Sequence, residues 1–212
     1  MNDRPPSGAG RPLDELRKEA WTGLVRAVRD AKHEWHLPVI STIDSEGRPT
    51  GRVVVLRGAW PEDADGPVIA CHTDRRSRKV EELARPGGDA VSWTFYERRH
   101  KVQLRLLGRT RVHVDDEVAD EAWRRTAATS RRCYLAPYGP SIPLDAWHPN
   151  LPEEWRASVP DPEVSETGRA NFCVVRTTVD VMERLELHHD GHVRSRWCWD
   201  GPRLVESTWL AP

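Results

Sequence analysis

The sequence predicts a mainly β protein, an antiparallel barrel with a few peripheral helices. Between residues 38 and 114, runs of β-branched and apolar residues are separated by turn residues. Similar runs return after residue 171. Strands and helices almost never alternate in a β-α-β order, which argues against a parallel sheet and for an antiparallel barrel decorated by helices.

Composition restricts the classes of protein to which the chain can belong. Its 212 residues are 38% hydrophobic and 31% charged, which is typical of one globular domain. The formal net charge of -1 provides no broad positive field for nucleic acid. No apolar run approaches the roughly 20 residues of a membrane helix, and the N-terminus lacks an apolar signal stretch. We therefore expect a cytoplasmic protein that binds neither nucleic acid nor membrane.

The first part of the chain predicts a lead-in, a helix and three strands. Residues 1–12 are rich in Pro, Gly and Arg and are expected to be a disordered lead-in to a single domain over 13–212. Leu16, Ala20 and Leu24 recur at helical spacing, which predicts a helix over 13–32. Apolar and β-branched runs predict strands at 38–43, 52–57 and 67–72.

The remainder predicts two helices, a proline-rich excursion and further strands. Ser77 occupies the N-cap position of a predicted helix that ends at Ala84. A second helix is expected over 117–130. Seven prolines lie between residues 134 and 167, which indicates a long ordered excursion or a lid. The predicted strands here are 89–96, 101–114, 171–178, 181–188, 193–199 and 203–209.

Residues 72–79, His-Thr-Asp-Arg-Arg-Ser-Arg-Lys, carry the clearest chemical signal. They lie between a strand and the start of a helix, where unpaired N–H groups and positive partial charge accumulate. Arg78 and Lys79 in the first turn are unfavourable there unless an anion binds. With the hydroxyls of Thr73 and Ser77, they would form a phosphate cradle. The alternative is a solvated basic turn with a serine cap. Arg52 and Arg57, which bracket an apolar strand, favour the anion site.

Four segments resemble, in the same order, motifs of the pyridoxamine 5'-phosphate oxidase family of FMN-binding split barrels. Arg52-Val-Val-Val-Leu-Arg57 resembles R-x-V-L-L-K, with arginine in place of lysine. Residues 73–79 resemble the Y-T-N-x-x-S-R-K loop and helix, and residues 103–108 resemble Q-V-R-V-x-G. Trp209-Leu-Ala-Pro212 resembles the closing R-L-A-P. The resemblance covers residues 35–114 well and 171–212 loosely.

The resemblance implies an FMN cofactor, a split-barrel fold and a homodimer with its sites at the subunit interface. It implies that Arg78, Lys79 and Thr73 hold the phosphate, and that Arg52 binds the phosphate or the ribityl chain. Gln103 is expected to bind the flavin edge from the partner subunit. The complete set of cofactor residues is Arg52, Val53, Val54, Val55, Leu56, Arg57, His72, Thr73, Ser77, Arg78, Lys79, Gln103 and Arg196.

Three departures separate the chain from the true oxidase. The two substrate-binding positions of the family's R-L-H-x-R motif hold His192 and Arg194 here, and Met182 or a neighbour replaces the flavin-stacking tryptophan. The substrate-phosphate cluster has no counterpart in register, although four arginines lie nearby. These departures favour the oxidase-related branch of the family. The nearby arginines are Arg124, Arg125, Arg131 and Arg132.

The predicted function is an FMN-dependent oxidase or reductase acting on a small molecule by hydride transfer through flavin N5. The candidate catalytic residues are Arg57, His192 and Arg194. The alternatives are a true pyridoxamine or pyridoxine phosphate oxidase, and a flavin-binding protein without turnover. No metal site is predicted, since His188 and His189 show no third ligand at suitable spacing. The scattered cysteines Cys71, Cys133, Cys173 and Cys198 also predict neither a zinc site nor disulfides.

Overall fold

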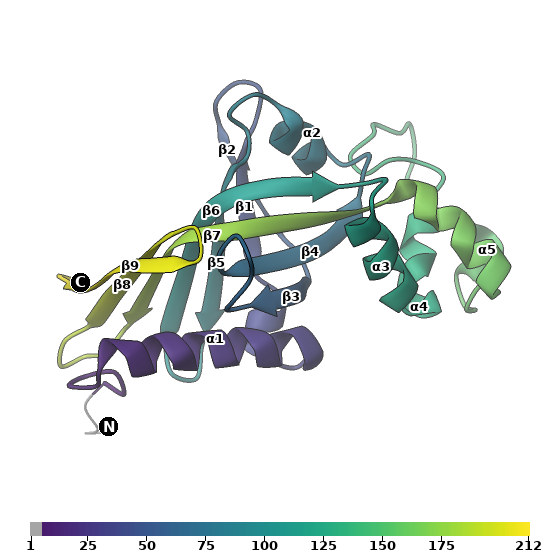
Figure 1. The fold of residues 1–212 in the computed structure, drawn as a ribbon. Helices are drawn as coiled ribbons and strands as arrows, with labels where there is room; N and C mark the ends of the chain where they lie inside the picture. Colours follow the sequence, from purple (N-terminus) through teal and green to yellow (C-terminus); the bar gives the residue numbers. More distant parts are fainter. Residues whose placement is uncertain (1–5) are drawn as a thin grey trace.

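The computed structural model of the chain describes residues 6–212. Its strands join in one antiparallel sheet in the order β2-β1-β5-β6-β7-β4-β3, with β8 and β9 added beside β7 (Figure 1). The sheet curves without closing, which is the split barrel that the sequence predicted. The strands are β1 (Val39–Ile43), β2 (Pro49–Val53), β3 (Leu56–Trp60), β4 (Val68–Asp74), β5 (Ala90–Glu97), β6 (Val102–His113), β7 (Phe172–Glu186), β8 (Val193–Asp200) and β9 (Arg203–Leu210).

The longest strand, β7, organises the sheet. One edge of β7 pairs with β6 over almost its whole length. Its other edge pairs first with β4, over Phe172–Thr178, and then with β8, over Val181–Glu186. The ladder between β6 and β7 shifts at Leu107 and Gly108, where a bulge bends the strands. The two parts of the sheet therefore diverge along one continuous strand.

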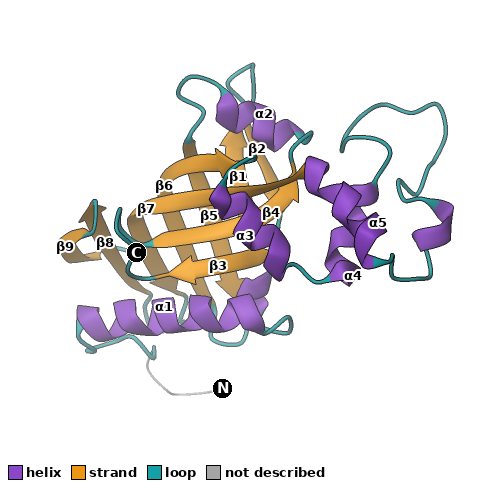
Figure 2. Ribbon diagram, turned by 45° about the vertical axis from the view of Figure 1, so that its right-hand side comes forward, coloured by secondary structure: helices purple, strands orange, loops and turns teal. Residues whose placement is uncertain are grey.

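Helices cover the sheet without interrupting it. Figure 2 shows α1 (Leu13–Arg29) running beneath the strands and α2 (Arg78–Ala84) above them, while the helices after β6 gather at one end. The side chains of Leu16, Trp21 and Leu24 on α1 are buried in the main core. The helices at the end of the sheet are α3 (Glu117–Arg125), α4 (Ala128–Arg131), α5 (Pro162–Glu166) and the short 3-10 turns η2 (Arg132–Leu135), η3 (Glu153–Trp155) and η4 (Thr167–Asn171); η1 (Glu34–His36) follows α1. No helix within residues 6–212 is long and apolar enough to cross a membrane.

Two strand predictions were wrong. The strand predicted over 52–57 is broken, because Arg52 pairs with β1 whereas Leu56 pairs with β4, so the chain crosses between two parts of the sheet at Val54 and Val55. The strands predicted over 171–178 and 181–188 are one strand. The strand continues through a bulge at Asp180, which has no partner on β6 between Leu107 and Gly108.

Two other predictions differ in detail. The helix predicted over 117–130 breaks at Thr126 and Ala127, which have extended backbones, and so forms α3 and α4. Residues 1–5 of the predicted lead-in lie outside the described residues. The rest of the lead-in is tied down, because the backbone N–H groups of Ser7 and Gly8 donate to the buried carboxylate of Glu186, at 2.5 and 3.0 Å.

Candidate functional site

Lys79 stands at the centre of the predicted phosphate cradle. Its Nζ donates hydrogen bonds to Thr73 Oγ1 at 2.7 Å and to Ser77 Oγ at 3.2 Å. Ser77 is the N-cap residue of α2 as predicted, but its hydroxyl does not cap the helix, because Lys79 uses it. Lys79 forms no ion pair with any carboxylate in residues 6–212. Burial lowers its pKa. A half-buried cation held only by hydroxyls fits an anion that supplies the missing charge.

Arg52 lies beside this group but already has a counter-charge. Its Nη2 donates to Glu82 Oε2 at 2.9 Å and to Thr50 Oγ1 at the same distance. Burial alone would raise the pKa of Glu82, yet the hydrogen bond from Thr42 and the charge of Arg52 outweigh burial and hold that pKa below its usual value. Arg52 Nη1 also donates to Thr42 Oγ1, so the three partners of Arg52 come from β1, β2 and α2. Sequence reasoning missed them because no motif links these elements.

A cavity of about 580 Å³ opens over these residues. Arg52, Ser77 and Lys79 line it together with Arg78, whose exposed side chain forms no ion pair within the described residues. Pro140 and Ser141, from the proline-rich excursion, close one side. Other charged side chains of both signs line the cavity, among them Asp44 and Glu46, which pair with Arg48.

The chain that crosses from β2 to β3 connects Arg52, in the wall of this cavity, with Arg57, in the walls of two others. Val53 is exposed and Val54 is buried, while Leu56 is fully buried inside the barrel, so only part of the predicted 53–56 wall faces outward. Arg57, which follows Leu56, is exposed and forms no ion pair among residues 6–212. Cavities of about 550 and 650 Å³ both have Arg57, His72 and Ser130 in their walls. The smaller one also touches Thr73, the partner of Lys79.

His72 is a neutral polar group at this junction. Burial, followed by the charge of Arg57, lowers its pKa to about 4. Its ring packs edge-on against Phe172, with the centroids 4.9 Å apart. Near neutral pH the ring of His72 is therefore uncharged, and Arg57 provides the positive charge in the walls that the two cavities share.

The arginines near the family's substrate-phosphate position are committed to protein groups. Arg131 donates to Glu166 at 2.8 Å and lies over the Trp123 ring, with the guanidinium carbon 4.6 Å from the ring centroid. Arg132 donates to the carbonyls of Trp155 and Ser158. Arg124 and Arg125 both pair with Glu121. These four arginines therefore already have partners within the protein.

Gln103, Arg194 and Arg196 lie at the other end of the sheet. Gln103 pairs with Leu185 of β7, whereas Thr73 pairs with Cys173. Twelve residues of β7 separate these two positions, on the order of 35–40 Å along a strand. This span is longer than a flavin mononucleotide. The predicted cofactor residues of one chain thus form two groups that cannot contact the same molecule.

The second group is largely paired within the protein. Arg194 donates to Glu183 at 2.8 Å, and Arg196 donates to Glu206 at 2.7 Å. His192 is exposed, and its Nδ1 accepts a hydrogen bond from the backbone of His188. Met182, considered as a replacement for a flavin-stacking tryptophan, is fully buried in the core and has no face free for a ligand.

The amino-acid sequence of the chain matches one known protein family over part of its length. Residues 18–114 match the family described as "Pyridoxamine 5'-phosphate oxidase, FMN-binding domain". This part of the chain, a little less than half of it, is similar to that family. We call Thr73, Ser77, Arg78 and Lys79 the Lys79 group. All four lie within the matched segment, and so do Arg57, His72 and Gln103. The match thus covers both groups of predicted cofactor residues except Arg196.

Part of the chain is also similar to two curated proteins that are named as oxidases. Pyridoxine/pyridoxamine 5'-phosphate oxidase 2 of Arabidopsis thaliana is 32% identical over 128 residues, which is 57% of this chain and 61% of the relative. The pyridoxine/pyridoxamine 5'-phosphate oxidase of Anaeromyxobacter dehalogenans is 30% identical over 127 residues, or 60% of this chain and 58% of the relative. The chain thus spans about three fifths of the length of the curated relatives that it matches.

Solved structures share the fold over nearly the whole chain. A pyridoxamine 5'-phosphate oxidase-related, FMN-binding protein of Nostoc punctiforme covers 92% of this chain and 96% of its own, with a TM-score of 0.66 and 19% identity. PhzG of Burkholderia lata, solved with tetrahydrophenazine-1-carboxylic acid, covers 100% and 99%, with a TM-score of 0.67 and 18% identity. At such identities the comparison supports the split-barrel fold of the family, not a shared substrate.

Proposed function

We propose that this protein is an FMN-dependent oxidoreductase whose two identical sites lie between the subunits of a homodimer. The observation that carries the proposal is the Lys79 group. The half-buried ammonium of Lys79 contacts two hydroxyls and, among residues 6–212, no carboxylate, and Arg78 lines the same cavity. Such a group favours a phosphate monoester, because the phosphate supplies the missing charge and accepts hydrogen bonds from every donor.

The rest of the cofactor would extend from this group toward Arg57. Thr73 and Lys79 mark the phosphate end, and the smaller of the two cavities at Arg57 begins at Thr73. FMN, when bound, supplies hydride transfer through its flavin ring. The backbone at Val53 and Val55 would line one side of that ring. Arg57 would stabilise negative charge that develops beside it, since no carboxylate in residues 6–212 neutralises this guanidinium.

A second copy of the chain would complete each site. Gln103 and Arg196 are too far from Lys79 to reach the same cofactor within one chain. In a two-fold dimer, the two ends of the sheet from different subunits can meet at one site, and the same contact then occurs twice. Exposed apolar side chains suit burial in such a contact, namely Ile43 on β1, Val53 on the edge strand β2, and Val205 and Trp209 on the edge strand β9.

The substrate would occupy the larger cavity, beyond the flavin ring. Apolar side chains, including Val118, Ala122 and Val174, line much of it, and Trp60 forms part of its rim. Arg176 in the same wall is paired with Asp63 at 2.7 Å, and Arg125 with Glu121. Arg57 is the unpaired cation of this cavity within the described residues. A largely apolar molecule with one negatively charged or carbonyl group fits these walls.

A true pyridoxamine or pyridoxine phosphate oxidase is the second candidate. The names of both curated relatives favour it. The commitment of Arg131 and Arg132 to protein groups argues against a substrate phosphate at the family's usual position. A flavin-binding protein without turnover is the third candidate, and only a functional assay separates it from the first.

Cofactor binding provides the first test. Purified protein is reconstituted with FMN and with riboflavin, and affinity is measured from the quenching of flavin fluorescence. Lys79→Met should weaken FMN binding about 10- to 100-fold, the effect of losing one charge-assisted hydrogen bond and its charge, and should change riboflavin binding little. Lys32→Met, an exposed lysine away from the site, is the matched control. Equal FMN affinity in Lys79→Met and wild type would remove the basis of the proposal.

Anaerobic reduction provides the second test. The flavin-loaded protein is mixed with reduced nicotinamide or with pyridoxine 5'-phosphate, and loss of the yellow absorbance is followed. Bleaching by a reduced nicotinamide supports a reductase, and bleaching by pyridoxine 5'-phosphate supports the true oxidase. Protein that binds FMN tightly but is reduced by no donor supports the non-catalytic candidate.

A further inference from the structure

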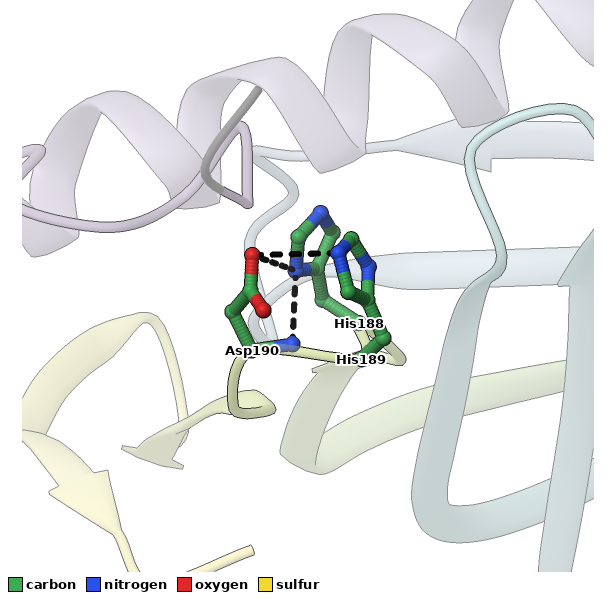
Figure 3. Close-up of side chains that lie close together, drawn as sticks. All are labelled: His188, His189 and Asp190. Atoms are coloured by element: carbon green, nitrogen blue, oxygen red, sulfur yellow. Dashed lines mark hydrogen bonds and ion pairs between the residues drawn. The ribbon is translucent and has the colours of Figure 1, made fainter. Parts of the chain in front are cut away.

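The turn between β7 and β8 brings three metal-binding side chains together, away from the cofactor residues of the Lys79 group. His188, His189 and Asp190 follow one another in this turn, and their side chains converge on one side of it (Figure 3). The sequence had indicated no third ligand for the two histidines. Asp190 supplies one, because the turn folds its carboxylate back toward both rings. His188 is half-buried, and the other two side chains are exposed.

The distances fit one ion shared by all three residues. Asp190 Oδ2 lies 3.1 Å from His189 Nε2 and 3.9 Å from His188 Nδ1, and the ligand atoms all lie within 4.8 Å of one another. Zinc binds imidazole nitrogen and carboxylate oxygen at about 2.0–2.2 Å in a tetrahedral site, so two ligand atoms of the same ion lie roughly 3.3–3.6 Å apart. The two distances from the carboxylate lie on either side of this spacing, and the exposed ring of His189 can turn toward His188 to close the set.

We propose that His188, His189 and Asp190 bind a divalent transition-metal ion of the zinc type. Two imidazoles and one carboxylate are a donor set that such ions prefer, and the exposed side of the turn leaves a fourth position for water. Calcium and magnesium, which prefer oxygen ligands, fit this set poorly.

The two histidine rings lie close together. The ring centroids of His188 and His189 are 4.3 Å apart, so both rings can reach one ion. Nδ1 of His188 accepts a hydrogen bond from the backbone N–H of Asp190 at 3.2 Å, which leaves this nitrogen unprotonated. A metal ion at Nδ1 replaces that hydrogen bond. The cost is small, because the exposed N–H of Asp190 can turn to water.

Metal binding would hold the turn in one conformation. The backbone N–H of His188 donates to Nδ1 of His192 at 3.1 Å, so the ring of His192 is attached to the proposed ligand set. Arg194 follows two residues later, as the second residue of β8. An ion at residues 188–190 thus acts as a clip on the segment that presents His192 and Arg194. This inference does not depend on FMN binding.

Calorimetric titration of the untagged, full-length protein with ZnCl2 tests the proposal. We expect one saturable site per chain. His189→Ala and Asp190→Asn should each weaken zinc binding at least about tenfold, the scale on which metal sites respond even to the loss of outer partners. His100→Ala is the matched control, because His100 is also exposed and also contacts a carboxylate, that of Glu97 at 2.9 Å. It should bind zinc as wild type does.

Two further measurements make the outcome clear. The circular dichroism spectra and melting temperatures of the variants show whether they are folded, as expected for changes at exposed positions. Addition of Co²⁺ should give visible ligand-field absorption that is lost in His189→Ala. Absence of saturable zinc binding in wild type, or unchanged affinity in both ligand variants, would overturn the proposal. The Lys79→Met variant should keep the zinc site, which separates this inference from the proposed function.

Discussion

Arg52 Nη2 lies 2.9 Å from Glu82 Oε2, so a carboxylate stands beside the group that we assign to the cofactor phosphate. The carboxylate lowers the positive charge that a phosphate would meet. Glu82→Gln removes this negative charge and keeps an oxygen for Thr42 and Thr50. We expect FMN to bind about 3- to 10-fold more tightly to this variant, as judged by fluorescence titration.

Riboflavin, which has no phosphate, is the control ligand for Glu82→Gln. The ratio of FMN affinity to riboflavin affinity should rise in the variant, since only FMN carries the charge that Glu82 repels. A fall in both affinities together would instead mean that Glu82 supports the shape of the site, and that its charge does not matter to the ligand.

His72 should make stability depend on pH. Its pKa is about 4 in the folded protein, against 6.5 for an unperturbed histidine. Above pH 6.5 the ring is neutral in both states. As the pH falls from 6.5 toward 4, the unfolded chain takes up a proton that the folded protein does not, so stability decreases, by up to about 3 kcal/mol from this residue. Urea unfolding of wild type and His72→Asn between pH 4.5 and 7.5 should show a smaller decrease in the variant. The exposed His100→Asn variant should follow wild type; an equal decrease in His72→Asn would contradict the assignment.

Gly108 is required where β6 passes the bulge in β7. A Cβ at this position would lie 2.0 Å from the carbonyl oxygen of Thr178, which is backbone and cannot move aside. Gly108→Ala should therefore lower the free energy of unfolding by about 3 kcal/mol or more. Gly51→Ala is the control, since a Cβ there would meet its nearest atom at 3.4 Å, an ordinary contact. Urea unfolding compares the two variants, and similar stabilities would show that the bulge adapts.

Complementation between two defective variants tests the homodimer. One variant carries Lys79→Met, and the other carries Gln103→Leu with Arg196→Leu. Each alone should bind FMN poorly. If every site takes residues from two chains, unfolding and refolding an equal mixture restores one intact site in each mixed dimer, or about a quarter of all sites. Flavin content after gel filtration measures this fraction. No recovery would mean that the two groups of residues do not serve one site.

The sequence predicted best those features that depend on local pattern. Helical spacing gave α1, and its predicted end differs by only three residues. Alternation gave β5 and β6 almost to the residue. The breaks were missed where tertiary pairing overrides local preference. Val54 and Val55 have high β propensity, but the chain must leave β1 and reach β4 there.

In the candidate site, too, contacts between residues near in sequence were predicted and contacts between distant residues were missed. Lys79, Thr73 and Ser77 lie within seven residues of one another, so a motif could indicate that they act together. Glu82 reaches Arg52 across thirty residues of sequence, and Thr42 and Thr50 come from two further strand positions. The contact of Asp190 with the two histidines was also missed, although it adjoins them, because the direction of its side chain depends on the conformation of the turn. Such contacts arise from folding, and no residue pattern encodes them directly.

The strand β7 borders both β4 and β8. Inserting or deleting one residue within β7 would therefore disturb more than one part of the sheet. A shift of one position after Thr178 would turn the side chains of the strand's second half to the other face. Buried Met182 and Arg184 would then point to solvent, and Glu183 would lose Arg194. We therefore expect length variation among natural relatives to concentrate in the exposed segment 141–148, and the interval from Phe172 to Glu186 to keep a constant length.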